Sequence, residues 1–322
     1  MLSHPNSMFG SSKNTDRADQ WRSLALKSLV VALVSVGLIG AVPGLAADSS
    51  SSSKPQRQSV SSTAVQAQVD KQTADATTDK RKQLLSDAVA AIAQTQQALK
   101  ALEDKKNDVA LKALADATGK LELIVARDPS LKLAPIATQV VTFDVFADPQ
   151  TLKLAIAEAK DALSDGDIPR ARPLVEALAS ETQIRTTNIP LATYPAAIKA
   201  ITPLIDAGKI DEAKTKLQAA LNTLVVTTDV IPLPKLRAEN LLKEAQVLAE
   251  KKDRSKDDND RLATHLKTVR EQLQMAELLG YAKKRDVQPM YAQVESIEKT
   301  SAGGKTGSGW FDKIRKQVAE AF

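Results

Sequence analysis

The sequence predicts a mainly α-helical protein: a compact helical domain built from about three related helical hairpins, with short extended or β segments between them. Apolar residues recur at helical spacing from about residue 81 onward. A short polar turn followed by an alanine occurs three times, and three stretches rich in β-branched residues interrupt the helical pattern. The chain has 322 residues, a length that fits one or two domains of ordinary size. Its hydrophobic fraction of 43% is enough to form a core.

The first segment, residues 1–47, has the layout of a secretory signal peptide. Basic residues precede an uncharged stretch that runs from Ser28 to Ala47 and contains the helix breaker Pro43-Gly44. The small residues that follow predict cleavage near Ala46 or Ala47, and therefore export. The alternative is an uncleaved anchor, because the uncharged stretch is just long enough to span a bilayer.

Residues 48–78 form a low-complexity segment. Ser, Thr, Gln, Asp and Lys dominate it, and large apolar residues are few. Such a composition does not repay the entropy lost on ordering, so the sequence predicts a flexible linker here.

Residues 79–302 are predicted to form the helical domain. In the segments LEDKKNDVA, LSDGDIPRA and IDAGKIDEA, an apolar residue lies eight positions before an alanine. The apolar members are Leu102, Leu163 and Ile205, and the alanines are Ala110, Ala171 and Ala213. We interpret each segment as the turn of a helical hairpin, with Gly166 and Gly208 ending two of the first helices. The alanines are 61 and then 42 residues apart, so the uneven spacing favours a compact domain over a solenoid.

Three extended stretches follow the hairpins, at Thr138–Phe146, Glu181–Ile189 and Leu224–Ile231. They can form an accessory sheet, or arms that expose a partner-binding edge, or they can be linkers packed over the helices. Isolated short strands are marginal, but three of them together favour at least one paired ladder.

Composition excludes most catalytic chemistries. The chain has no cysteine, and its two histidines are His4 and His265, so thiolate nucleophiles and cysteine-ligated metals are excluded. We predict no catalytic residue, no metal site and no cofactor. The 44 basic and 39 acidic residues are interspersed, which argues against a nucleic-acid partner.

Two short motifs resemble ligand sites but are incomplete. Gly304-Lys305-Thr306 contains part of a phosphate-binding loop, but Lys299 stands where the pattern needs its first glycine. The segment from Lys251 to Arg261 gathers four aspartates without the glycine or the acidic twelfth ligand of a calcium loop. We therefore interpret the second segment as a solvated turn between helices.

His265 is a candidate pH sensor, because imidazole titrates in the range that acid stress reaches. The alternative interpretation is a boundary residue between core and solvent on a predicted helix.

Residues 303–322 are predicted to form a glycine hinge and a C-terminal amphipathic helix. One helical stripe carries the interaction candidates, which are Trp310, Phe311, Ile314, Val318 and Phe322. Such a helix can dock in a groove of its own domain, on a neighbouring subunit or on a membrane surface.

The run from Thr193 to Gln246, TYPAAIKAITPLIDAGKIDEAKTKLQAALNTLVVTTDVIPLPKLRAENLLKEAQ, resembles the signature stretch of the YfdX family of exported bacterial proteins. Further similar segments extend the resemblance over roughly Arg81 to Lys316. The resemblance implies a mostly α-helical, self-associating periplasmic protein that is linked to acid or other stress. It carries no catalytic residue to this chain.

We therefore expect an exported, periplasmic, non-enzymatic binding protein of the YfdX type, stress-linked and chaperone-like. The alternative is a carrier or scavenger of amphipathic small molecules. Expected partners are further copies of the chain in a homo-oligomer and unfolded client proteins or small amphipathic molecules. We expect no nucleic acid partner and no stable membrane insertion after signal removal.

Overall fold

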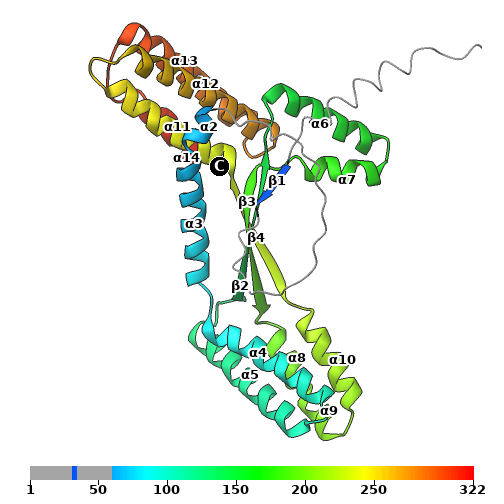
Figure 1. Cartoon of the computed structure of the whole chain (residues 1–322). Coiled ribbons are helices and arrows are strands. Elements are labelled where there is room, and N and C mark those ends of the chain that lie inside the picture. The colour runs from blue at the N-terminus through cyan, green and yellow to red at the C-terminus, as the bar shows by residue number, and fades with distance from the viewer. Residues whose placement is uncertain (1–30, 35–59) are drawn as a thin grey trace, which may run out of the picture.

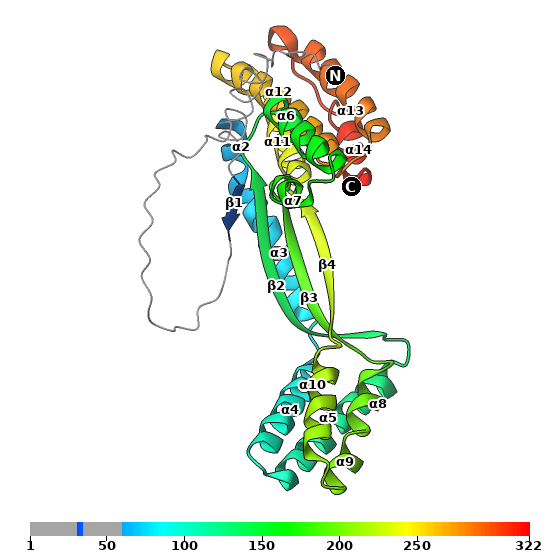
Figure 2. The same cartoon turned by 90° about the vertical axis from the view of Figure 1, so that its right-hand side faces the viewer.

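The computed structural model describes residues 31–34 and 60–322. It is elongated: two helical lobes stand at opposite ends of a narrow antiparallel sheet, as Figures 1 and 2 show. The prediction of a mainly helical chain with short β segments is confirmed. The structure differs from the predicted single compact body, because the sheet holds the hairpins apart.

The sheet has the strand order β1-β2-β3-β4, and neighbouring strands are antiparallel. The strands are β1 (Val31–Val34), β2 (Leu133–Val145), β3 (Glu181–Pro190) and β4 (Val225–Pro232). The last three correspond to the three extended stretches of the sequence, so the expected paired ladder is present. β1 lies within the segment predicted as a leader and pairs with the end of β2.

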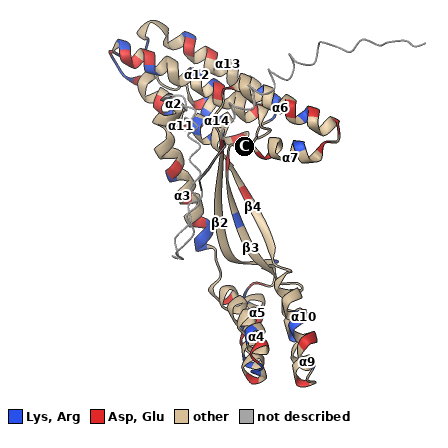
Figure 3. Cartoon of the chain, turned by 45° about the vertical axis from the view of Figure 1, so that its right-hand side comes forward, with Lys and Arg blue, Asp and Glu red and all other residues tan. Residues whose placement is uncertain are grey.

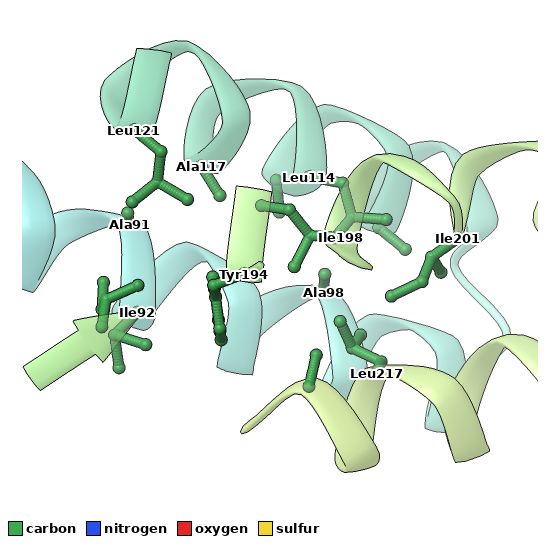
Figure 4. Close-up of a cluster of buried hydrophobic side chains, with 14 of the residues drawn as sticks. Ala91, Ile92, Ala98, Leu114, Ala117, Leu121, Tyr194, Ile198, Ile201 and Leu217 are labelled. Carbon is green, nitrogen blue, oxygen red and sulfur yellow. The ribbon is translucent and has the colours of Figure 1, made fainter. Parts of the chain in front are cut away.

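One end of the sheet carries the distal lobe, which we define as α4 (Ser86–Glu103), α5 (Asn107–Arg127), α8 (Tyr194–Lys199), α9 (Thr202–Asp206) and α10 (Ile210–Leu221). Figure 4 shows its core, where Tyr194 lies among leucine, isoleucine and alanine side chains of several helices. Ala110 and Ala213, which follow the predicted hairpin turns, are fully buried there. The absence of a larger side chain lets the helices approach closely.

The other end carries the C-terminal lobe, which we define as α2 (Val60–Ala64), α11 (Leu233–Glu250), α12 (Lys256–Leu278), α13 (Lys284–Ser301) and α14 (Asp312–Glu320). A short 3₁₀ turn, η1 (Ala302–Gly304), follows α13. Val65 joins the core of this lobe from the N-terminal side.

The remaining hairpin, α6 (Pro149–Ser164) and α7 (Ile168–Glu176), stands beside the C-terminal lobe. Asp148 caps α6 through the backbone N–H groups of Gln150 and Thr151, and Pro149 occupies the first helical turn. Ala171 is buried as its position predicts, but Leu163 is 50% exposed, unlike its counterparts Leu102 and Ile205. Among the residues that the structure describes, no further helix covers Leu163.

The flexible linker predicted over residues 48–78 is wrong from residue 60 onward. α2 and then α3 (Gln66–Lys82) occupy that stretch, and residues 48–59 lie outside the described residues. Only Val69 and Thr77 of α3 are buried, so its amphipathic pattern is faint. Polar contacts hold the helix instead: Gln72 accepts a hydrogen bond from Asn240 at 2.8 Å.

Candidate functional site

A cavity of about 620 Å³ lies between α3 and the sheet face that β2 and β3 form; we call it the α3 cleft. Figure 1 shows α3 running alongside the sheet. The lining residues are Gln66, Val69, Asp70, Thr73, Ala74, Thr77, Thr78, Arg81, Val140, Thr142, Asp144, Phe146, Thr182 and Leu233. A cavity of this size can hold a small organic molecule.

The periods of helix and strand place these residues on facing surfaces. Val69, Thr73 and Thr77 are four residues apart, so they share one face of α3. Val140, Thr142 and Asp144 alternate along β2 and therefore share one face of the sheet. The register pairs Thr142 with Thr182, which brings β3 into the same wall.

A buried ion pair closes the end of the α3 cleft next to the C-terminal lobe. Arg237 of α11 and Asp144 of β2 are 3% and 6% exposed, and Arg237 donates to both carboxylate oxygens, at 3.1 and 2.5 Å. The Ser180 hydroxyl donates to Asp144 Oδ1 at 2.8 Å. Arg237 also donates to Gln66 Oε1 at 3.4 Å, so the network ties α11, the sheet and α3 together.

The same network extends to a tyrosine of the C-terminal lobe. The Ser180 backbone N–H donates to the Tyr281 hydroxyl oxygen at 3.0 Å. Burial raises the pKa of Tyr281, and the neighbouring Glu181 raises it further, so this hydroxyl stays protonated.

The threonines make the cleft less polar than its composition indicates. The Thr77 hydroxyl donates to the Thr73 carbonyl at 2.8 Å, and the Thr142 and Thr182 hydroxyl oxygens lie 3.0 Å apart. Hydroxyl groups bonded in this way are satisfied within the protein. Thr73 Oγ1 is buried and has no hydrogen-bond partner within residues 60–322, so this lining hydroxyl is unsatisfied within the described part of the chain.

A second cavity, of about 540 Å³, lies where the sheet meets the distal lobe. One wall is apolar and includes Ile124 and Leu131, and the sheet side carries Thr186 and Asn188. Ion pairs fill much of its polar surface: Lys80 Nζ lies 2.9 Å from Asp229 Oδ2. The α3 cleft has fewer internally paired charges and is the stronger candidate site.

The sequence-predicted residues lie away from the α3 cleft. His265 of α12 is 6% exposed, so the boundary interpretation does not describe it, and its Nδ1 has no partner among the described residues. Burial lowers the pKa of His265, the Arg261 charge lowers it further, and Glu244 of α11 acts in the opposite direction.

The C-terminal helix packs against its own chain. Phe311, Ile314 and Val318 are at most 1% exposed, in the core of the C-terminal lobe, and Trp310 and Phe322 pack against that core while half-buried. Of the three docking sites that the sequence left open, α14 therefore occupies the one within its own domain.

The two incomplete motifs have structural roles. Asp258, one of the four aspartates, forms a capping box with Ser255 at the start of α12. A hydrogen bond from Lys251, followed by those from Ser255, lowers the pKa of Asp258 to about 2. Lys305 of the Gly-Lys-Thr sequence follows η1, and its carbonyl accepts a hydrogen bond from Arg254.

Within residues 31–34 and 60–322, no group of three or more His, Cys, Asp or Glu side chains is arranged to hold a metal ion. In that same part of the chain, none of the helices has the length and apolarity needed to cross a bilayer. Figure 3 shows basic and acidic residues mixed on both lobes.

Sequence reasoning missed the α3 cleft, because its walls come from distant segments. One local signal was present: Asp144 is the charged residue in the mostly apolar stretch VVTFDVF. A charge in a half-buried strand needs a counter-charge, which here is Arg237.

Comparison with known proteins gives a family match and a similarity to solved structures. Residues 91–230 match the family model described as YfdX protein. A structure of YfdX from Salmonella Typhi is 16% identical, with a TM-score of 0.34, and the alignment covers 47% of this chain and 93% of that chain. A score this low does not establish a shared overall fold. A search of curated proteins found no match.

The family match spans the distal lobe from α4 onward, the α6–α7 hairpin, and the strands β2 and β3 with most of β4. It confirms the resemblance read from the sequence. Residues 91–230 are therefore similar to the YfdX family, which is what the resemblance in the sequence led us to expect.

Proposed function

We propose that the protein is a non-enzymatic binding protein that holds a small amphipathic molecule in the α3 cleft. The observation that supports this function is the cavity itself, about 620 Å³ with apolar walls and few free polar groups. An apolar cavity favours a carrier over a protein that only shields clients. The carrier therefore becomes the first hypothesis, ahead of the chaperone-like role.

Binding of an uncharged amphipathic dye, Nile red, tests this function. The full-length chain should bind it saturably, and Thr73→Leu, which fills the cavity, should abolish the saturable component. Asp75→Leu is the matched control, because Asp75 lies on the exposed side of α3 and does not line the cleft. Equal dye binding by both variants would show that the dye binds elsewhere and would remove the support for the cleft.

A chaperone-like role is the second candidate, and the α6–α7 hairpin supports it. Four large apolar residues there are about half exposed or more: Leu154, Leu163, Ile168 and Val175. Exposed apolar surface on an otherwise folded protein is typical of an interaction site. The protein should suppress the aggregation of unrelated acid-treated proteins. The double variant Leu154→Ser with Leu163→Ser should lose this effect.

Export to the periplasm and self-association complete the proposal. The layout of residues 1–47 supports export, and N-terminal sequencing of the exported protein should return a start near Ala47 or Asp48. Residues 225–230 of the terminal strand β4 are all exposed, which supports pairing with another copy. Sedimentation over a range of concentrations measures this association.

A further inference from the structure

We infer that the α3 cleft takes an anionic single-chain amphipath, with its acidic head group at Arg81 and its apolar chain directed toward the C-terminal lobe. This inference rests on the proposed binding function and adds the charge and the orientation of the ligand.

Polarity changes along the cleft. At the end next to the C-terminal lobe, beside the Asp144–Arg237 ion pair whose charges compensate each other, Val69 packs with Leu233 in a small apolar cluster, and Phe146 lines the same region. The middle carries threonines, of which Thr77 has its hydroxyl turned to the helix backbone. Arg81, in the last turn of α3, is the basic residue of the lining. An elongated ligand with one apolar and one polar end matches this gradient.

The carboxylates that line the cleft already accept hydrogen bonds from other side chains of the protein. Asp144 is held by Arg237 and Ser180, and Asp70 Oδ1 accepts a hydrogen bond from the Gln66 side-chain amide at 2.8 Å. These carboxylates lie toward the end next to the C-terminal lobe, where they disfavour an anionic head group. They therefore orient an anionic ligand with its head toward Arg81.

Arg81 differs from its two neighbours because its side chain has no hydrogen bond or ion pair within the described residues. Lys80 pairs with Asp229 at 2.9 Å, and Lys82 pairs with Asp79 at 3.0 Å. The Arg81 guanidinium keeps its donors free, and such a planar group binds a carboxylate through two parallel hydrogen bonds. Free donors at this end of the cleft favour an acidic head group over an ammonium group.

The length of α3 sets the length of the ligand's alkyl chain. Arg81 lies twelve positions after Val69, which at the helical rise of 1.5 Å per residue is about 18 Å. An alkyl chain of roughly a dozen carbons, with its head group, spans such a distance, so dodecanoate is a suitable probe.

Calorimetric titration of the full-length chain with dodecanoate, dodecanol and dodecyltrimethylammonium, all below micelle-forming concentrations, tests the inference. Dodecanoate should bind one molecule per chain, about tenfold more tightly than dodecanol. Arg81→Gln should remove that preference and leave dodecanol binding unchanged. Lys82→Gln is the matched control, since it removes an adjacent charge that does not line the cleft, and it should change neither affinity.

Three results would overturn the inference while leaving the proposed function standing: equal binding of dodecanoate and dodecanol, tighter binding of the cationic probe, or a dodecanoate preference that Arg81→Gln retains. Failure of all three probes, together with the absence of saturable Nile red binding, would overturn the binding function as well. Retention of the dodecanoate preference in Arg81→Gln would show that the head group lies elsewhere.

Discussion

Replacing Arg237 by methionine should destabilise the protein strongly, because it leaves Asp144 buried without its cation. Asp144 is 6% exposed and would lose both hydrogen bonds from the guanidinium, keeping only the one from Ser180. Removing one partner of a buried ion pair typically costs about 3 to 5 kcal/mol. For a chain of this size each kcal/mol lowers the thermal midpoint by about 2 to 4 °C, so a fall of roughly 10 °C is expected.

Urea denaturation at pH 7 measures this loss, and two variants control it. Lys299→Met removes one partner of the exposed Lys299–Glu295 pair, whose side chains are 75% and 54% exposed, and should cost under about 1 kcal/mol. Replacing both members, Asp144→Leu with Arg237→Met, should recover much of the stability, because no unpaired charge remains. Equal and small losses from Arg237→Met and Lys299→Met would refute the reasoning.

Three further outcomes follow from burial and charge. Ala213→Leu should overpack the distal lobe and cost about 1 to 3 kcal/mol, measured as a lower thermal midpoint, whereas leucine at the exposed Ala219 should have little effect. The folded-state pKa of His265 lies below its usual 6.5, so the unfolded chain takes up a proton first and stability falls as pH drops below about 6.5. His265→Gln should flatten that part of the stability curve, and an unchanged slope would assign it to carboxylates. Phe311→Ala should cost about 3 to 5 kcal/mol, and an unaltered denaturation curve would mean that the tail is not docked in solution.

Local signals predicted the hairpins well. Gly166 and Gly208 have φ values of 71°, the left-handed conformation that ends a helix, and Asp167 caps α7. The next hairpin starts its second helix differently: Asp211 lies in the first turn of α10, and its carboxylate pairs with Lys214 at 2.7 Å. Such details depend on one or two dihedral angles, which residue type constrains only weakly.

Long-range features were harder to predict. The three strands were recognisable, but their register depends on contacts such as Val140 with Ile184, which no local pattern encodes. α3 was missed because 15 of its 17 residues are not buried, so tertiary contacts rather than an apolar stripe keep it helical. The α3 cleft depends on both features and was therefore beyond sequence reasoning.

The composition of the distal lobe core has a consequence for how the chain folds during synthesis. Its buried residues come from two stretches, Ala88–Ala134 and Ile189–Ala220, and the α6–α7 hairpin, which lies at the other end of the sheet, separates them in the chain. The first stretch leaves the ribosome with its apolar face uncovered. This apolar face remains uncovered until the second stretch has been synthesised, at least 55 residues later. Contacts of such sequence separation slow folding, because the loop between them must close before they form. A nascent chain that stops before β3 therefore exposes the apolar residues of the first stretch. Proteases and chaperones can recognise this exposed surface, which is buried once the lobe is complete.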